Sequence, residues 1–204
     1  MHIVDGALAN PVVIGGAVLA TGGIALGLRS LNMERIPVAG VLSASFFIAS
    51  LIHVPIGPSS VHLILNGMAG MILGWAAFPA LFVGLLLQAA FFGFGGVTVL
   101  GINTFNIAMP AVIVGVICRP FIRNGSCTLA AIWGGIGGAL AIALTTAFVG
   151  LSLALSGEQF LVAARLVFFA HIPVMVIEGL LTAAAVTLAV RVKPRLFHAL
   201  EIPG

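Results

Sequence analysis

Long apolar runs separated by short polar breaks make up almost the whole chain. A helix that crosses a bilayer needs roughly 20 apolar residues, with a range of about 17 to 25. The runs predict seven spans, over residues 11–28, 36–52, 61–77, 79–94, 107–118, 128–155 and 160–190. The breaks between them are rich in glycine, proline and asparagine, which favour turns. The pattern therefore predicts an all-α integral membrane protein, with residues 1–204 as one membrane-embedded domain.

Composition supports this fold class and excludes others. Hydrophobic residues make up 61% of the chain and charged residues 6%, with a mean hydropathy of +1.29. Soluble domains carry about 25% charged residues. The net charge of +3 comes from basic residues scattered among the breaks, which argues against a nucleic-acid-binding patch. The spacing of Cys118 and Cys127 indicates neither a zinc site nor a disulfide framework.

The basic residues predict the orientation of the chain. With seven spans, all of them but Arg165 fall at the same side of the membrane; they are Arg29, Arg35, Arg119, Arg123, Arg191, Lys193 and Arg195. Loops rich in lysine and arginine face the cytoplasm. We therefore expect the C-terminus inside the cell and the N-terminus outside it.

The first residues carry an unusual set of metal donors. The α-amine of Met1, the amide nitrogen of His2 and the His2 imidazole can close fused chelate rings around one cation. The amine must lose its proton to bind, so the affinity should rise with pH. We interpret residues 1–9 as a metal-chelating segment, with the carboxylate of Asp5 as a supporting group. The alternative is that His2 is an ordinary surface residue.

A second histidine is expected near this terminus. His53 and His62 lie on the predicted outer side, and Asn66 follows His62 by four residues, so it should share a helix face with His62 and orient its ring. Four nitrogens, including the His62 imidazole, can then converge. Such a planar set suits Ni²⁺ or Cu²⁺ better than Zn²⁺. The alternative is that His62 only bonds a loop carbonyl at a helix start.

Residues 93–109 are apolar yet contain glycines, Asn103 and Asn106 and are followed by Pro110, all of which disfavour a continuous helix. Irregular backbone at membrane depth is tolerated where protein buries it or where it lines a cavity. We expect this segment to be an irregular loop that covers the metal pocket as a plug or gate, with Asn103 and Asn106 supporting the ligands. A partly buried connector is the alternative.

His171 and Glu178 lie inside the last predicted span, two helical turns and roughly 10 Å apart. Ionisable groups within a membrane helix usually face the bundle interior and are paired. We expect structural or coupling roles for both rather than ligation of one ion. Small residues at 16, 20, 23 and 27 give the first span a close-packing face, which either packs internally or contacts a partner.

Four separated motifs resemble the CbiM/NikM family, the substrate-binding S components of energy-coupling factor (ECF) transporters for cobalt and nickel. They lie at residues 1–6, around His62, at 95–103 and at 171–179. The resemblance implies capture of Co²⁺ or Ni²⁺ by Met1, His2 and His62 in the plasma membrane of a prokaryote. It also implies a transmembrane T component, two ATP-binding subunits that hydrolyse ATP and often a small N component, so the chain itself would be no enzyme.

Other classes of membrane protein remain as alternatives. A secondary metal transporter or channel should show two inverted repeats with broken helices, and no such repeat is evident. A membrane-bound redox or enzymatic metalloprotein would need ligands at matching depth. Nitrogen donors favour nickel over cobalt in general, but the sequence leaves the choice between these metals open.

Overall fold

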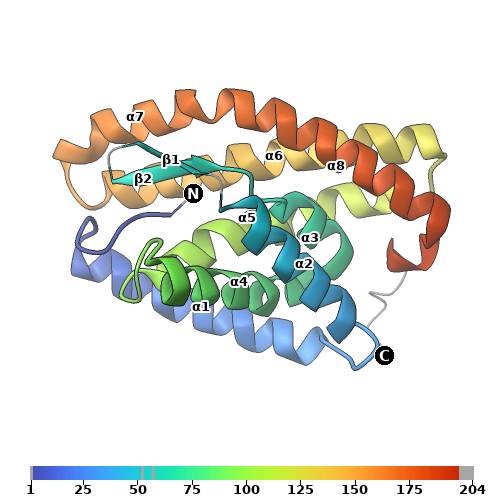
Figure 1. Cartoon of the computed structure of the whole chain (residues 1–204), viewed down its shortest axis with the longest axis horizontal. Coiled ribbons are helices and arrows are strands. Elements are labelled where there is room, and N and C mark those ends of the chain that lie inside the picture. The colour runs from blue at the N-terminus through green and yellow to red at the C-terminus, as the bar shows by residue number, and fades with distance from the viewer. Residues whose placement is uncertain (1, 52, 57, 198–204) are drawn as a thin grey trace.

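The computed structural model describes residues 2–51, 53–56 and 58–197 as a helical bundle with one β-hairpin (Figure 1). The helices are α1 Asn10–Ser30, α2 Ile36–Ala49, α3 Asn66–Leu73, α4 Ala77–Phe92, α5 Leu100–Arg123, α6 Cys127–Ala154, α7 Leu161–Ala170 and α8 Ile172–Val192. Short 3₁₀ turns lie at Gly74–Ala76, Glu158–Phe160 and Pro194–Phe197. The strands β1 His53–Ile56 and β2 Ser59–His62 pair antiparallel, with His53 opposite His62.

Among the described residues, five helical stretches are long and apolar enough to cross a membrane, and α2 is a shorter apolar helix. One of the five, Asn66–Phe92, contains both α3 and α4. Asn66 donates to the carbonyl of Ile107 in the first half of α5, whereas the carbonyl of Met71 accepts from Arg119 near its end. Helix α3 therefore runs parallel to α5.

Helix α4 runs the other way. Phe78, at its start, packs at Gly23 in the second half of α1, whereas Gln88 near its end reaches His2 at the beginning of the chain. The reversal follows Gly74, whose φ of 58° is a left-handed conformation that glycine adopts without strain. With α7 and α8 counted as one crossing, the bundle is consistent with the seven predicted spans.

Two predicted helix starts are wrong. The span predicted to begin at 61 starts at Asn66, because residues 59–62 pair with β1. Helix α5 begins at Leu100, so only 93–99 is irregular, not 93–109. Pro110 lies inside α5, since neighbouring helices can compensate for the one backbone hydrogen bond that it removes.

Glycines allow the helix backbones to approach closely. A Cβ at Gly70 would overlap the carbonyl of Ala111, and one at Gly115 would overlap the carbonyl of Gly70, so α3 and α5 touch backbone to backbone. The small-residue face of α1 is also buried: Gly16 lies against Ile102 of α5. Internal packing, not a partner, therefore occupies this face.

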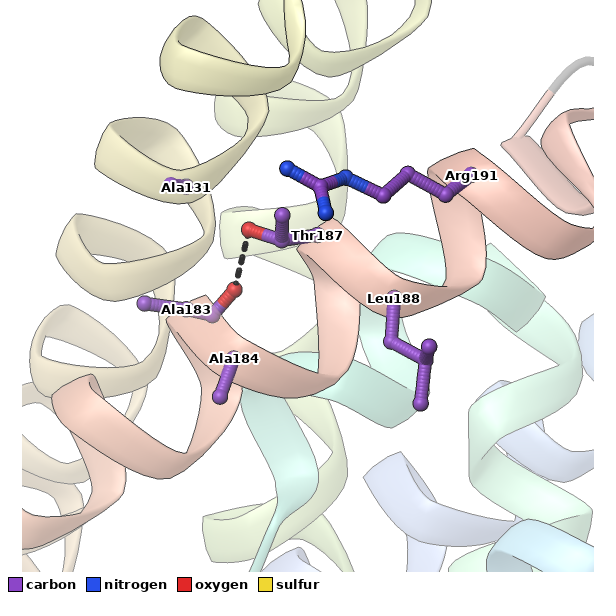
Figure 2. Close-up of a pocket in the computed structure, with 6 residues that line it drawn as sticks. All are labelled: Ala131, Ala183, Ala184, Thr187, Leu188 and Arg191. Carbon is purple, nitrogen blue, oxygen red and sulfur yellow. Dashed lines mark hydrogen bonds between the residues drawn. The ribbon is translucent and has the colours of Figure 1, made fainter.

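Helices α6 and α8 pack along their lengths. A shallow groove at one end of this contact is lined by Ala131 of α6 and, on α8, by Ala183, Thr187 and Arg191 (Figure 2). Thr187 donates to the carbonyl of Ala183, a bond of 2.7 Å that satisfies its hydroxyl within the helix. The side chain of Arg191 lies along this groove.

The last predicted span is interrupted at His171, between α7 and α8. Pro173 lacks the amide hydrogen that would continue the ladder, which ends α7 and starts α8. The imidazole of His171 is fully buried, and its Nδ1 lies 2.6 Å from the carbonyl of Val167. The buried imidazole of His171 therefore contacts the last turn of α7 at this break.

The two ends of the bundle differ in chemistry. The segment before α1, the β-hairpin and the turn between α4 and α5 lie at one end, which carries His2, His53 and His62 (Figure 1). The α1–α2 loop and the segment after α8 lie at the other end, which we call the basic end because it carries Arg35, Lys193 and Arg195. The positive-inside rule predicts that the basic end faces the cytoplasm.

The glycine contact between α3 and α5 gives a test of this packing. We expect Gly70→Ala to lower the free energy of unfolding by at least about 2 kcal/mol, because backbone atoms cannot rotate away from the new methyl group. Gly22→Ala, in the exposed face of α1 with nothing near its Cβ position, should be neutral or stabilising by about 0.5 kcal/mol. Thermal unfolding in detergent measures both; equal effects would contradict the contact.

Candidate metal centre

The N-terminal segment is held in an extended form between the hairpin and α5. Asn103 makes two bonds of 3.0 Å to the backbone of Ile3, accepting from its amide and donating to its carbonyl. The amide of Val4 donates to the carbonyl of Pro58, and that of Asp5 donates to the carbonyl of Gly95. Backbone bonds on both sides therefore fix where residue 2 lies.

His2 and His62 meet in the interior, and each side chain is only 3% exposed. Their rings stack with centroids 4.6 Å apart and an interplanar angle of 25°. Nδ1 of His2 lies 3.2 Å from Nε2 of His62. The His2 amide is directed at Ser60 Oγ over a longer distance of 3.4 Å.

A chain of hydrogen bonds fixes the tautomer of His2. Ser50 donates its hydroxyl proton to the carbonyl of Phe46 at 2.8 Å, so its oxygen accepts from the amide nitrogen of Gln88. The carbonyl oxygen of Gln88 is then the acceptor toward Nε2 of His2, at 2.6 Å. Because Nε2 must donate, Nδ1 of neutral His2 carries a lone pair.

His62 is fixed in the opposite sense. Its Nδ1 lies 2.8 Å from the carbonyl of Leu63, which can only accept, so Nδ1 carries the proton and Nε2 the lone pair. The two unprotonated nitrogens thus lie 3.2 Å apart. With metal–nitrogen distances of about 2.0 Å, neighbouring ligands at one ion stand about 2.8 Å apart. A cation between the two nitrogens would convert an unfavourable contact into a favourable one.

Burial keeps both rings neutral. It lowers the pKa of His2 to about 4, although the bond to Gln88 opposes this and His53 adds to it. Burial likewise lowers the pKa of His62 to about 4, against the effect of the Leu63 carbonyl. At neutral pH both lone pairs are therefore free of protons, which is the state that binds metals.

Glu178 holds the chain that follows His62. Its carboxylate, fully buried in α8, accepts from the amides of Ile64 and Leu65, the latter at 2.9 Å. Leu65 adopts a left-handed backbone with φ 56°, which is uncommon for a residue other than glycine. Glu178 thus stabilises the sharp turn between β2 and α3. His171 instead contacts the carbonyl of Val167, in the last turn of α7.

The predicted supporting groups behave differently from one another. Asp5 accepts from the hydroxyl of Thr98 at 2.5 Å and from the amide of Val99, at the start of α5. Asn103 positions the segment beside His2, as described above. Asn106 instead exchanges hydrogen bonds with Ser152 of α6 and not with His2 or His62. Its predicted place beside the ligands is therefore wrong.

The role predicted for Asn66 is also wrong. His62 ends β2 and Asn66 begins α3, with left-handed Leu65 between them, so the two residues share no helix face. Asn66 donates to the carbonyl of Ile107 and to the hydroxyl of Thr145, both at 2.9 Å. The carbonyl of Leu63 orients the His62 ring instead.

A cavity of about 140 Å³ opens beside His2. Phe94 lines it and packs edge-on against His53 at 4.2 Å between ring centroids, while its distance to the His2 ring is 6.1 Å. The irregular turn before α5 therefore supplies one wall of the space next to the paired imidazoles.

Sequence reasoning missed Gln88 and Ser50, which set the tautomer of His2. The signal was available, because Gln88 is the only polar residue in α4 and a buried polar group in an apolar helix is usually functional.

Met1 lies outside the described residues. Within the part of the chain that the structure describes, no group of three or more His, Cys, Asp or Glu side chains could hold a metal. At this centre, the described side chains that can donate a lone pair to a metal are the imidazoles of His2 and His62.

Comparisons with known proteins place this chain among metal uptake components. The family described as "Cobalt uptake substrate-specific transmembrane region", CbiM, matches residues 2–196. A putative metal transport protein of Haemophilus influenzae is 41% identical over 203 residues and 98% of each chain. The fused nickel transport protein NikMN of Rhodobacter capsulatus is 41% identical over 83 residues, 40% of this chain and 24% of the relative.

Solved structures show the same fold. A crystal structure described as a truncated transition metal transporter superposes with a TM-score of 0.69 and 25% identity, over 94% of this chain and 97% of the other. The apolar helices and the family together indicate a multi-pass membrane protein. The chain belongs to the CbiM family of cobalt and nickel uptake components.

Proposed function

We propose that this chain captures Ni²⁺ or Co²⁺ at the N-terminal end of the bundle as the substrate-binding subunit of an ATP-driven ECF importer. The observation that carries the proposal is the close approach of two unprotonated nitrogens, Nδ1 of His2 and Nε2 of His62, which lie 3.2 Å apart in the interior. A buried polar pair without a proton between its nitrogens is costly, and a divalent cation is the simplest occupant.

The N-terminus would supply the remaining donors. The amide of His2 and the α-amine of Met1 follow directly from the imidazole along the chain, so all three can close chelate rings on one ion. The long contact of 3.4 Å from the His2 amide to Ser60 gives that nitrogen little to lose when a metal replaces its proton. Four nitrogens in a plane suit Ni²⁺, and Co²⁺ can use the same set.

Access to the ion would depend on the turn of residues 93–99. Phe94 lines the cavity beside His2, and Gly95 bonds the chain at Asp5. Movement of this turn would open the site outward, whereas its present position shields the imidazoles. We assign it the role of a gate.

The names of two fused relatives support partner subunits for this chain. The relatives named NikMN and CbiMQ are fused proteins, and this chain corresponds to 37% of the CbiMQ of Methanocorpusculum labreanum. Their names support association with further membrane components, including a T component and a small N component. Two ATP-binding subunits would then drive release of the metal inward. A stand-alone secondary transporter or channel is the second candidate, because the chain alone forms a membrane bundle.

Substitutions in the centre should weaken metal binding in a graded way. His62→Ala removes a ligand, so Ni²⁺ affinity should fall more than about 100-fold, and Gln88→Leu, which frees the His2 tautomer, should cost about 10- to 100-fold. Isothermal titration in detergent measures both. Cys118→Ser and Gln159→Leu, a residue exposed in the turn before α7, are the controls. Equal affinities of Gln88→Leu and Gln159→Leu would refute the role of the hydrogen-bond chain.

The pH dependence of affinity should identify the N-terminal donors. Both imidazoles have a pKa of about 4 and are already neutral at pH 6. The α-amine titrates near pH 8, so each unit between pH 6 and 7.5 should raise Ni²⁺ affinity about tenfold or more. Acetylation of Met1, or a few added residues before it, should lower the affinity more than about 100-fold and flatten this profile. An unchanged affinity after acetylation would show that the amine does not bind.

Uptake by cells separates the importer from the stand-alone transporter. Cells that lack other nickel and cobalt uptake systems should accumulate labelled metal only when this chain is produced together with a T component and the ATP-binding subunits. The His62→Ala variant provides the background level. Accumulation by the chain alone, at the level of the full set, would favour the secondary transporter or channel.

A further inference from the structure

A second polar cavity lies at the basic end, opposite the histidines. It has a volume of about 220 Å³ and is lined by three cationic side chains: Arg35 from the α1–α2 loop, and Lys193 and Arg195 after α8. The metal centre uses none of these residues. Two segments about 160 positions apart in the sequence therefore bring their charges to one space.

Arg35 is unusual among the three. Its side chain is only 7% exposed, and its Nη2 has no hydrogen-bond partner. Its backbone is fixed, because its amide donates to both the carbonyl and the side-chain oxygen of Asn32, at 3.0 and 3.1 Å. A buried polar atom that lacks a partner is costly. The side chain of Arg35 also lines the cavity, so an anion there could draw the guanidinium group toward itself.

The lining indicates what kind of acceptor fits. One carboxylate, Glu34, faces three cations, so the cavity favours an anion. The remaining walls are largely apolar and include Ile72 and Leu73 at the end of α3. Arginine and lysine together bind phosphate oxygens well. A ligand with a phosphate next to a hydrocarbon part satisfies both kinds of wall.

The surroundings place the cavity at a membrane surface. Ile36 and Val192, the neighbours of Arg35 and Lys193 in the sequence, are 47% and 75% exposed. Ile36 is the first residue of α2 and Val192 is the last residue of α8, and both helices are apolar. The hydrocarbon core of the membrane would therefore begin next to the three cations. Anionic lipids are enriched in the cytoplasmic leaflet, and basic pockets between membrane helices bind their headgroups.

We propose that this cavity binds the phosphate group of an anionic phospholipid, held by Arg35, Lys193 and Arg195. The headgroup would join the α1–α2 loop to the segment after α8. Arg191 takes no part, because its side chain lies in the separate groove between α6 and α8 (Figure 2). The bound lipid would stabilise the basic end of the bundle independently of the metal.

Native mass spectrometry and thermal unfolding of the full chain in detergent test this proposal. Added phosphatidylglycerol should give a lipid-bound species and raise Tm, whereas phosphatidylcholine should do neither. Arg35→Ala and the double variant Lys193→Ala/Arg195→Ala should each weaken lipid binding, by about fivefold for every cation removed. The double variant alters exposed residues only, so it remains informative if Arg35→Ala fails to fold.

Arg29→Ala is the matched control, since Arg29 lies at the same end but does not line the cavity. Three outcomes would overturn the proposal. The first is equal phosphatidylglycerol binding by wild type and both cavity variants. The second is an equal rise of Tm with inorganic phosphate, which would assign the cavity to a free anion. The third is no lipid binding together with loss of T-component association in the variants, which would assign it to a protein partner.

Discussion

The structure depends on the fixed direction of one hydrogen-bond chain. Ser50 has a carbonyl acceptor in its own helix, so it presents its oxygen to Gln88, and Gln88 presents its oxygen to His2. These hydrogen bonds link α2, α4 and the N-terminal segment. As a result, Nδ1 of the buried His2 ring carries no proton.

The opposing imidazole is fixed by a different set of elements. The hairpin brings His62 to the interior, and the buried carboxylate of Glu178 holds the turn that follows it. The pair of neutral rings therefore rests on both halves of the bundle, α2 and α4 on one side and α8 on the other. Any relative movement of these halves would change the distance between the two nitrogens, and under the proposed function this would connect helix motion with release of the ion.

Local patterns in the chain predict its class, but not the direction of every polar side chain. The apolar runs predicted the membrane class, and the basic residues gather at one end as expected. His2 and His62 were predicted to meet, and they stack at 4.6 Å. The prediction for Asn66 assumed that spacing along a helix reports the direction of a side chain, and left-handed Leu65 and the β-hairpin broke that assumption. The prediction for Asn106 assumed an irregular loop, whereas this residue lies in α5 and bonds Ser152 of α6.

The sequence by itself determined the class of protein and the donors available to a metal, because hydrophobic runs and nitrogen-bearing side chains are local properties. It did not determine which nitrogen of each ring is free. That choice depends on Gln88, 86 positions from His2, and on a carbonyl next to His62. Proton positions are set by neighbours in space, so only the tertiary structure turned two histidines in an apolar chain into a buried pair with unprotonated nitrogens 3.2 Å apart.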